Sequence, residues 1–568
     1  MEITLLVILD SSDQENYRVY QETIPPFLEH FGIPYREIDL VKEESINFNA
    51  SGILIAQEGL GKRMDQRTKK SLYRAVKQGT GLINLDYHLD SYKKLYEPLK
   101  IEKVEAESKT SLIKIGEKHY INELHPHLLP PPLRGRIEER GMEKQLLQPL
   151  KFLKVKTKNK PLLLAEDNSP LLLCSSPKLI QFLISPRLWL PEYFGHCAGL
   201  DDILFRAIIW AVKKPFVTKT IPPFVTSRID DANGSANIFG KRKDLANKNF
   251  AYLDMLNKFG LIPNIGLFID DITEEDSKII KEKYDKKLAD FSPHAFSDPK
   301  NINEFPVYMH HNGKEFSKEE LKENFARVDK KFQDWGIKPS KTVNAHFDEI
   351  GLNSLPFLKE RGQIYTMNPI RFGKTWIDEK ARDWKPKPYG DTGFNFDYML
   401  DDPDFFNVCT GTKSGPKDYL TPSFDFLYGC TSFWKENSKN DVQKAALRGA
   451  EQIKLGLDSG FFGCLMAHEQ RIAILSIKEF EEILERIDGL LSDHEKIFAS
   501  YDEIAEYLYH HQQTKLKEIK IEGNKISCQL AGKSTIPLKL SIFREMRGKI
   551  KKELCNLPPF SVEVEVVL

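Results

Sequence analysis

The sequence predicts an α/β protein in three parts: an N-terminal doubly wound parallel sheet over residues 1–214, a central β/α barrel over residues 215–511 and a small β domain over residues 512–568. Three observations lead to this prediction. Short apolar runs alternate with amphipathic segments in the first part, the same alternation resumes at a larger scale in the second, and the third contains only short alternating strands. Strands that alternate with helices are typical of parallel sheets.

The first part shows its strands as the runs "ITLLVILD", "SGILIAQEG" and "GTGLINLD", which are separated by amphipathic segments. It ends in "YFGHCAGLDDILFRAIIWAVKKP", which resembles the closing helix of the class I glutamine-amidotransferase-like fold, especially its ThuA-like branch. A nucleophile elbow needs a Cys or Ser at a tight strand-to-helix turn, and the corresponding stretch "IAQEGLGKRM" has neither. We therefore expect this part to be structural or to bind a ligand, and not to be catalytic.

The second part repeats a unit of helix, Gly stop and strand, as in "LANKNFAYLDMLNKFGLIPNIGLFIDD". This repetition is typical of a β/α barrel, whose site lies at the carboxyl ends of the strands. In the third part, "LKEIKIEGNKISCQL" predicts a hairpin that turns at Glu-Gly-Asn.

Composition excludes several classes of function. Lys plus Arg and Asp plus Glu number 82 each, so no net charge favours nucleic acid or an anionic membrane. Seven scattered cysteines without a CxxC pair indicate neither a disulfide framework nor a thiolate zinc site. We find no signal peptide and no apolar run near the roughly 18 residues of a membrane span, so we expect a cytoplasmic protein. The sequence leaves the oligomeric state open.

The stretch "FVTSRIDDANG" places two carboxylates, Asp230 and Asp231, at the end of the first barrel strand. Neighbouring side chains of a strand point to opposite faces, so this pair suits a site better than a core. The chain here resembles the polysaccharide deacetylase (NodB-like) superfamily. The resemblance implies that Asp230 is the general base and that Asp231 is a metal ligand.

The same resemblance implies two histidine ligands in a His-x-x-x-His motif, and the sequence departs from it. In "SPHAFSD", His294 is followed four positions later by Asp298, and "VYMHHNG" adds His310 and His311 before a helix. His294 is the first expected ligand, and His310 is preferred over Asp298 as the second. Such a donor set would suit zinc, with nickel or cobalt as alternatives.

The third motif also departs from the family, because the usual arginine is absent from "TVNAHFDEIGLNSLPFL". His346 and Asp348 stand there instead and are expected to bind substrate. Arg228 lies two positions before Asp230, on the same face of the strand, and could replace the missing arginine.

The last motif, "FFGCLMAHEQRI", puts His468 at the end of an apolar strand, where the resemblance implies a proton donor to the leaving amine. Asp425 could orient it. Several aromatic residues near strand ends could stack on sugar rings: Tyr308, Trp376, Trp384 and Trp434.

Together these observations predict a metal-dependent hydrolase that removes an acetyl or similar acyl group from an N-acylated sugar or polysaccharide. The main alternative is a catalytically silent carbohydrate-binding or assembly protein on the same barrel, which the altered second and third motifs favour. A glycosidase is less favoured, because two adjacent carboxylates cannot flank a glycosidic bond at a separation of roughly 5 to 9 Å.

Overall fold

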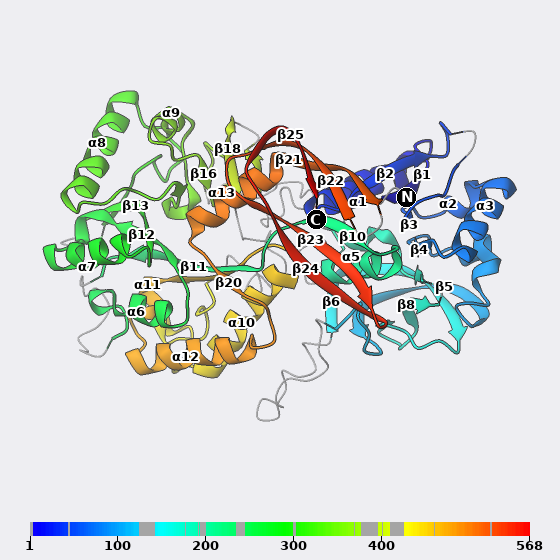
Figure 1. Cartoon of the computed structure of the whole chain (residues 1–568). Coiled ribbons are helices and arrows are strands. Elements are labelled where there is room, and N and C mark those ends of the chain that lie inside the picture. The colour runs from blue at the N-terminus through cyan, green and yellow to red at the C-terminus, as the bar shows by residue number, and fades with distance from the viewer. Residues whose placement is uncertain are drawn as a thin grey trace. The chain divides into compact units, whose positions relative to one another are not determined.

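Two structural units make up the computed structural model (Figure 1). The first comprises Met1–Ile221, Asp458–Gly460 and His510–Leu568, and the second comprises Pro222–Leu457 and Phe461–Tyr509. The predicted three-part division at residues 214 and 511 stays a prediction. The structure describes residues 4–43, 46–123, 143–176, 178–190, 192–193, 200–234, 245–298, 303–367, 370–375, 396–399, 402–408, 425–458, 460–522 and 525–567.

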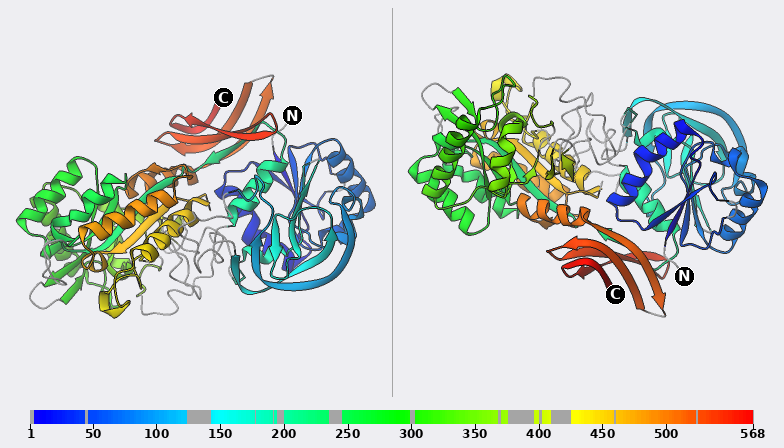
Figure 2. Two further views of the ribbon diagram at one scale, coloured as in Figure 1. Left: turned by 90° about the horizontal axis from the view of Figure 1, so that it is seen from below. Right: turned by 90° about the horizontal axis from the view of Figure 1, so that it is seen from above.

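A nine-stranded sheet with the order β2-β1-β3-β4-β9-β8-β7-β5-β6 organises the described N-terminal residues of the first unit. In Figure 2 this region is coloured blue to cyan. The strands from β2 to β9 in this order are parallel, and the rest are antiparallel. The predicted parallel strands are therefore present, within a larger mixed sheet. The strands are β1 (Leu5–Leu9), β2 (Tyr35–Asp39), β3 (Gly52–Ile55), β4 (Gly81–Asn84), β5 (Ile101–Ile115), β6 (Glu143–Thr157), β7 (Leu163–Ala165), β8 (Pro170–Ser175) and β9 (Leu179–Phe182).

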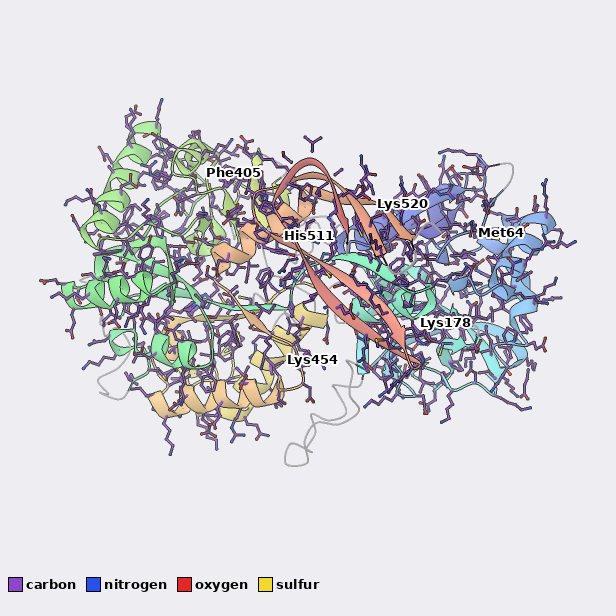
Figure 3. The ribbon with its side chains drawn as sticks, viewed as in Figure 1. Met64, Lys178, Phe405, Lys454, His511 and Lys520 are labelled. Atoms are coloured by element: carbon purple, nitrogen blue, oxygen red, sulfur yellow. The ribbon has the colours of Figure 1, made fainter. Side chains whose placement is uncertain are left out.

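Within the described residues, the α-helices that accompany this sheet are α1 (Gln14–His30), α2 (Leu60–Arg63), α3 (Gln66–Lys77) and α5 (Asp201–Ala211). The side chain of Asp13 caps α1 and that of Asp65 caps α3, each by accepting a backbone N–H of the first turn. Buried apolar residues, among them Met64 (Figure 3), form the core between helices and strands.

The C-terminal strands form two further sheets in the first unit, with the orders β10-β23-β24 and β21-β22-β25. The predicted hairpin is confirmed, because β21 and β22 pair antiparallel with Glu522 opposite Lys525. Strand β10 lies within the range predicted for the barrel, yet it pairs with β23. The strands are β10 (Phe216–Thr220), β21 (Thr514–Glu522), β22 (Lys525–Ser534), β23 (Leu538–Met546), β24 (Lys549–Leu557) and β25 (Phe560–Val567).

The second unit has a sheet with the order β14-β13-β12-β11-β19, in which β20 also pairs with β11, and a separate sheet with the order β15-β16-β18-β17. The predicted α/β class is confirmed. Among the strands that the structure describes, however, the pairing does not close into a barrel. The strands are β11 (Phe224–Ala232), β12 (Pro263–Phe268), β13 (Asp290–Asp298), β14 (Asn303–Pro306), β15 (Thr342–Val343), β16 (Tyr365–Thr366), β17 (Phe396–Met399), β18 (Asp402–Val408), β19 (Gly463–His468) and β20 (Ile497–Phe498).

Local sequence explains where several helices of the second unit begin and end. Capping boxes open α7, α8 and α12. Gly260, Gly336 and Gly362 follow α6, α8 and α9 with positive φ, which is the left-handed conformation that ends a helix. These are the Gly stops that the sequence predicts. The helices are α6 (Ala251–Lys258), α7 (Glu274–Asp285), α8 (Lys318–Asp334), α9 (Leu355–Glu360), α10 (Val442–Asp458), α11 (Glu469–Ile472), α12 (Ile477–Leu490) and α13 (Tyr501–Gln512).

One large core fills the second unit. It joins the strands to the helices around them through buried residues such as Phe405 of β18 (Figure 3), whose ring packs edge-on against Phe372 at a centroid distance of 5.3 Å. Across the described part of the chain, none of the helices combines the length and the apolar character needed to cross a bilayer.

Candidate metal centre

The parallel strands of the second unit bring polar residues to one edge of their sheet. Strands β11, β12, β13 and β19 are parallel neighbours, so their carboxyl ends lie together. Asp230 and Asp231 lie just before the last residue of β11, Ala232, and His468 is the last residue of β19. His346 follows the short strand β15.

Two β-bulges aim side chains at this edge. In the β11–β12 pair, Ile229 lies opposite Ile265 and Ala232 opposite Leu267, so Asp230 and Asp231 together face one residue, Gly266. Asp231 adopts a positive φ of 56°. Bulges re-aim side chains beside functional sites. The irregular register explains how two adjacent carboxylates can both serve one site, although a regular strand would separate them.

The second bulge lies in β13. Leu267 pairs with Pro293 and Phe268 with Ala295, so His294 is the extra residue. Gly266 lies between the two bulges. A Cβ atom on Gly266 would lie 2.8 Å from His294 Nδ1 and 2.9 Å from Asn344 Nδ2, which is closer than van der Waals contact allows. The glycine therefore permits the close packing of the histidine against the strand.

Asp231, His294 and His346 form a buried group in which one donor atom of each lies within 4.8 Å of the others. Asp231 Oδ1 is 3.1 Å from His294 Nε2 and 3.6 Å from His346 Nε2. His294 Nδ1 lies 2.9 Å from the carbonyl oxygen of Asn344, which can only accept a hydrogen bond. Nδ1 is therefore the N–H donor, as is usual for a metal-ligating histidine.

This tautomer leaves His294 Nε2 facing a carboxylate oxygen. Two lone pairs at 3.1 Å repel each other, so either a proton or a cation must lie between the two atoms. One carboxylate oxygen and two imidazole nitrogens form a donor set that suits zinc and related divalent ions. The residues present therefore fit a divalent cation.

The surroundings of the group set the protonation of its three side chains differently. Burial acts to raise the pKa of Asp231, but the hydrogen bond from His294 and the nearby His468 and His346 hold it far below its usual range. Burial acts to lower the pKa of His294, but the bond to Asp231 raises it above its usual value. Burial lowers the pKa of His346 to about 3, so this imidazole is neutral at neutral pH.

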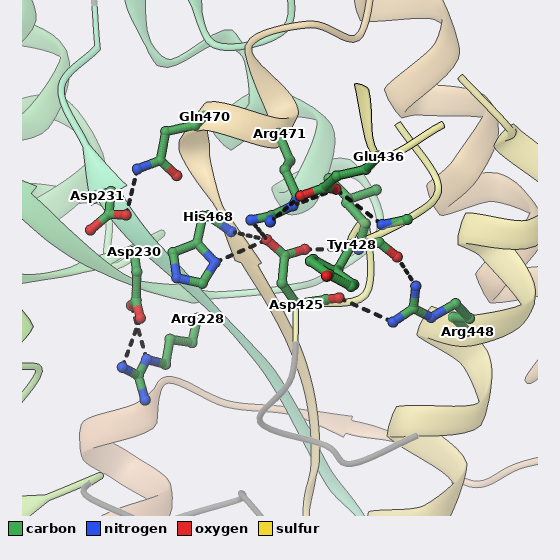
Figure 4. A network of polar contacts seen from close by, with 12 residues as sticks. Arg228, Asp230, Asp231, Asp425, Tyr428, Glu436, Arg448, His468, Gln470 and Arg471 are labelled. Carbon is green, nitrogen blue, oxygen red and sulfur yellow. Dashed lines mark hydrogen bonds and ion pairs between the residues drawn. The ribbon is translucent and has the colours of Figure 1, made fainter. Parts of the chain in front are cut away.

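Asp230 contacts Arg228 and Asn344. Its Oδ1 accepts hydrogen bonds from Arg228 Nε at 2.9 Å and Asn344 Nδ2 at 2.8 Å, and its Oδ2 is 2.7 Å from Arg228 Nη2. Figure 4 shows the contacts between Arg228 and Asp230. Burial opposes ionisation, but the charge of Arg228 lowers the pKa of Asp230. Arg228 also lies 3.1 Å from Asp348, so it bridges two of the predicted residues.

His468 is paired with Asp425 on the other side of the site (Figure 4). Asp425 Oδ2 is 2.9 Å from His468 Nδ1, and Arg471 Nη1 contacts the same oxygen at 3.1 Å. Burial acts to lower the pKa of His468, but Asp425 and the nearby Asp231 raise it to about 9. The ring is therefore protonated at neutral pH, with 31% of the side chain exposed.

Other predicted residues lie elsewhere. His310 packs its ring on Phe316 at a centroid distance of 4.0 Å, outside the group of three donors, while His311 Nδ1 lies 2.7 Å from Glu349. Asp298 ends β13, but its side chain lies outside the described residues.

The prediction that Tyr308 could stack on a sugar ring is wrong. Its ring is 1% exposed, and its hydroxyl donates to the carbonyl of Pro293, so it cannot stack on a sugar. Trp376, Trp384 and the side chain of Trp434 lie outside the described residues.

Sequence reasoning missed three residues of the centre: Asn344, Gly266 and Gln470. Asn344 contacts both Asp230 and His294, and Gln470 donates a hydrogen bond to Asp231. Asn344 follows directly after the apolar strand β15 and two positions before His346, so a search for polar residues at strand ends could have found it. No local signal marks Gly266 or Gln470.

Comparisons with known proteins assign no family. No protein-family model matches the chain, and no curated protein matches it. One similar solved structure is a candidate polysaccharide deacetylase from Mycobacterium smegmatis, with 12% identity, a TM-score of 0.34 and coverage of 54% of this chain and 99% of that one. Another is a beta-arabinopyranosidase, with 11% identity, a TM-score of 0.23 and coverage of 63% of this chain and 57% of that one. Both likenesses are too weak to support an assignment.

Proposed function

We propose that this protein is a metal-dependent hydrolase that removes an acetyl or similar acyl group from the nitrogen of an acylated sugar or polysaccharide. One observation carries the proposal: the buried donors of Asp231, His294 and His346 converge beside Asp230 and the protonated His468. The choice of an N-acylated carbohydrate rests on the sequence motifs that resemble the polysaccharide deacetylases. A cytoplasmic location and the absence of nucleic-acid and membrane partners remain part of the proposal.

Asp231, His294 and His346 would hold the cation. A bound divalent ion supplies a Lewis acid that polarises the acyl group and makes water easier to deprotonate. Asp230 would accept the proton from water, because its carboxylate is ionised. Arg228 and Asn344 fix the orientation of that carboxylate. Arg228 would thereby take the place of the arginine that the third motif lacks.

His468 would deliver the proton to the departing amine. Asp425 occupies its Nδ1, so Nε2 is the nitrogen free to donate. Because the pKa of His468 is raised to about 9, the imidazole carries this proton at neutral pH and can donate it to the departing amine. An amine is a poor leaving group unless it is protonated, and a positioned acid is the usual solution.

The first test measures metal and turnover in the same preparation. The purified chain should contain about one divalent ion and release acetate from an N-acetylated oligosaccharide, and a chelator should remove both. Asp230→Asn should keep the ion but lose about 10² to 10⁴ of the rate, the usual contribution of a general base. Full activity after chelation would contradict the proposal. A chain that binds no metal, and whose affinity for a glycan is unchanged in Asp230→Ala, would instead be a catalytically silent binding protein.

A further inference from the structure

The two carboxylate oxygens of Asp231 have different partners. Oδ1 faces the Nε2 atoms of His294 and His346, at 3.1 and 3.6 Å. Oδ2 accepts a hydrogen bond from the side-chain amide of Gln470 (Figure 4). One oxygen therefore faces the other donors, and the second is occupied by a protein group.

The backbone that carries Gln470 is fixed on both sides. Gln470 lies in the short helix α11, directly after the end of β19. Before it, Glu469 accepts hydrogen bonds from the backbone N–H groups of Asn233 and Gly234 and from the Tyr252 hydroxyl, at 3.2, 3.0 and 2.7 Å. After it, Arg471 is paired with Asp425 at 3.1 Å.

Glu469 also links α11 to the loop that follows Asp231. Its bonds to Asn233 and Gly234 hold the two residues that come directly after the end of β11. The backbone segments that carry Gln470 and Asp231 are therefore held next to each other, within reach of the hydrogen bond between their side chains.

We propose that Gln470 is a positioning residue that holds Asp231 as a ligand through Oδ1 alone. This inference rests on the proposed function, since it concerns the same cation site. A carboxylate can offer one oxygen or both to a cation, and a second oxygen would fill a position that water or substrate needs. To offer both oxygens, the carboxylate of Asp231 would have to rotate, and the hydrogen bond from Gln470 to Oδ2 opposes this rotation.

The chemistry of the amide suits this role. Gln donates a hydrogen bond without carrying a charge, whereas Lys or Arg in its place would repel a cation close by. Residues that orient ligands in this way change metal affinity even though they do not touch the metal.

The test uses the full-length protein, freed of metal and then titrated with Zn²⁺ in competition with a chelating dye. Gln470→Met keeps the length and volume of the side chain but has no donor, and Gln470→Ala removes both. Each should weaken Zn²⁺ binding by about 10- to 100-fold, the usual effect of losing such a partner. Gln333→Ala, at an exposed position of α8, is the matched control and should bind as the wild type does.

A second measurement reports the number of ligands. The visible absorption of bound Co²⁺ becomes weaker as its coordination number rises, so Gln470→Met should absorb less than the wild type. Circular dichroism checks that each variant is folded. If Gln470→Met shows wild-type Zn²⁺ affinity or a wild-type Co²⁺ spectrum, the positioning role of Gln470 is overturned, but the proposed function is not. A wild-type protein that binds no metal would overturn the proposed function as well, so the two failures can be told apart.

Discussion

The two units of the chain each carry polar residues at the carboxyl ends of parallel strands, but they use them differently. In the first unit, Asp86 follows β4 and accepts hydrogen bonds from the backbone N–H groups of Gly59 and Gly61, at 2.9 and 2.8 Å, and from the Tyr92 hydroxyl at 3.0 Å. In the second unit, Asp231 faces two imidazole nitrogens. Within the described residues of the first unit, no comparable group of three donors occurs.

The strand register accounts for the difference. The pairs β1–β2, β1–β3 and β3–β4 run without a shift, so side chains alternate regularly to the end of each strand. In the second unit, β11 and β13 each carry a bulge beside Gly266. A carboxylate such as that of Asp86, which accepts hydrogen bonds from several N–H and O–H groups, stabilises the fold. A carboxylate that a bulge turns toward other electron-pair donors can hold a cation.

The largest expected effect tests this comparison at its two aspartates. Loss of a residue that only hydrogen-bonds to a metal ligand weakens metal binding by up to roughly 100-fold. Asp231→Asn should weaken it by more, because this substitution removes a charged ligand. Asp86→Asn should leave metal binding unchanged but lower the free energy of unfolding by about 1–3 kcal/mol, since its amide cannot accept every donor. Metal analysis and urea unfolding of both variants provide the measurements. The comparison fails if Asp86→Asn loses the metal while folded, or if Asp231→Asn retains it.

The second prediction concerns the glycine between the bulges. Gly266→Ala should displace His294 and Asn344, because its Cβ would lie within 3.0 Å of both side chains, and metal affinity should fall by about tenfold or more. The matched control is Gly489→Ala in α12, where a Cβ would meet no atom within 4 Å. That change should stabilise the helix by about 0.5–1 kcal/mol without altering metal binding. Unchanged metal affinity in Gly266→Ala would show that the bulges do not need this close packing.

The third prediction is a change in pH dependence. His468 must be protonated to act as an acid, so the rate should fall as pH rises through its pKa of about 9. Asp425→Asn removes the carboxylate that raises this pKa and should move the alkaline limb toward the ordinary histidine value of 6.5. Rates of acetate release between pH 5 and 10 measure the shift. If the alkaline limb of the pH profile does not move in Asp425→Asn, His468 is not the general acid.

The smallest effect on the metal site is expected from a substitution at Asp290, which lies at the amino end of β13, in the sheet that carries the site. Burial and the charge of Asp502 raise the pKa of Asp290, the first residue of β13, to about 7 from 3.8. A raised carboxyl pKa gives stability that is complete below about pH 4 and is lost as pH rises through about 7. Asp290→Asn should therefore raise the urea midpoint relative to wild type at pH 8, with little gain at pH 4. Metal affinity should stay the same, and a loss of it would show that both strand ends contribute to the site.

The sequence predicted much of the scaffold because its signals are local. The Gly stops at Gly260, Gly336 and Gly362 depend on a backbone conformation that glycine adopts easily. Strand ends with polar residues drew attention to Asp230, Asp231 and His468. The predicted barrel is not seen among the described strands, because closure depends on which distant strands pair and the repeated helix–strand pattern does not determine that.

The sequence by itself therefore determined the α/β class, the strand that carries the aspartate pair and the histidine at the end of β19. Only the tertiary structure decided that His346 joins Asp231 and His294, while His310 packs against Phe316. It also revealed Asn344 and Gln470 as partners, from segments more than a hundred residues away in the chain. The physical reason is that two bulges and the packing around Gly266 set the direction of these side chains, and such long-range contacts leave no periodic pattern in the sequence.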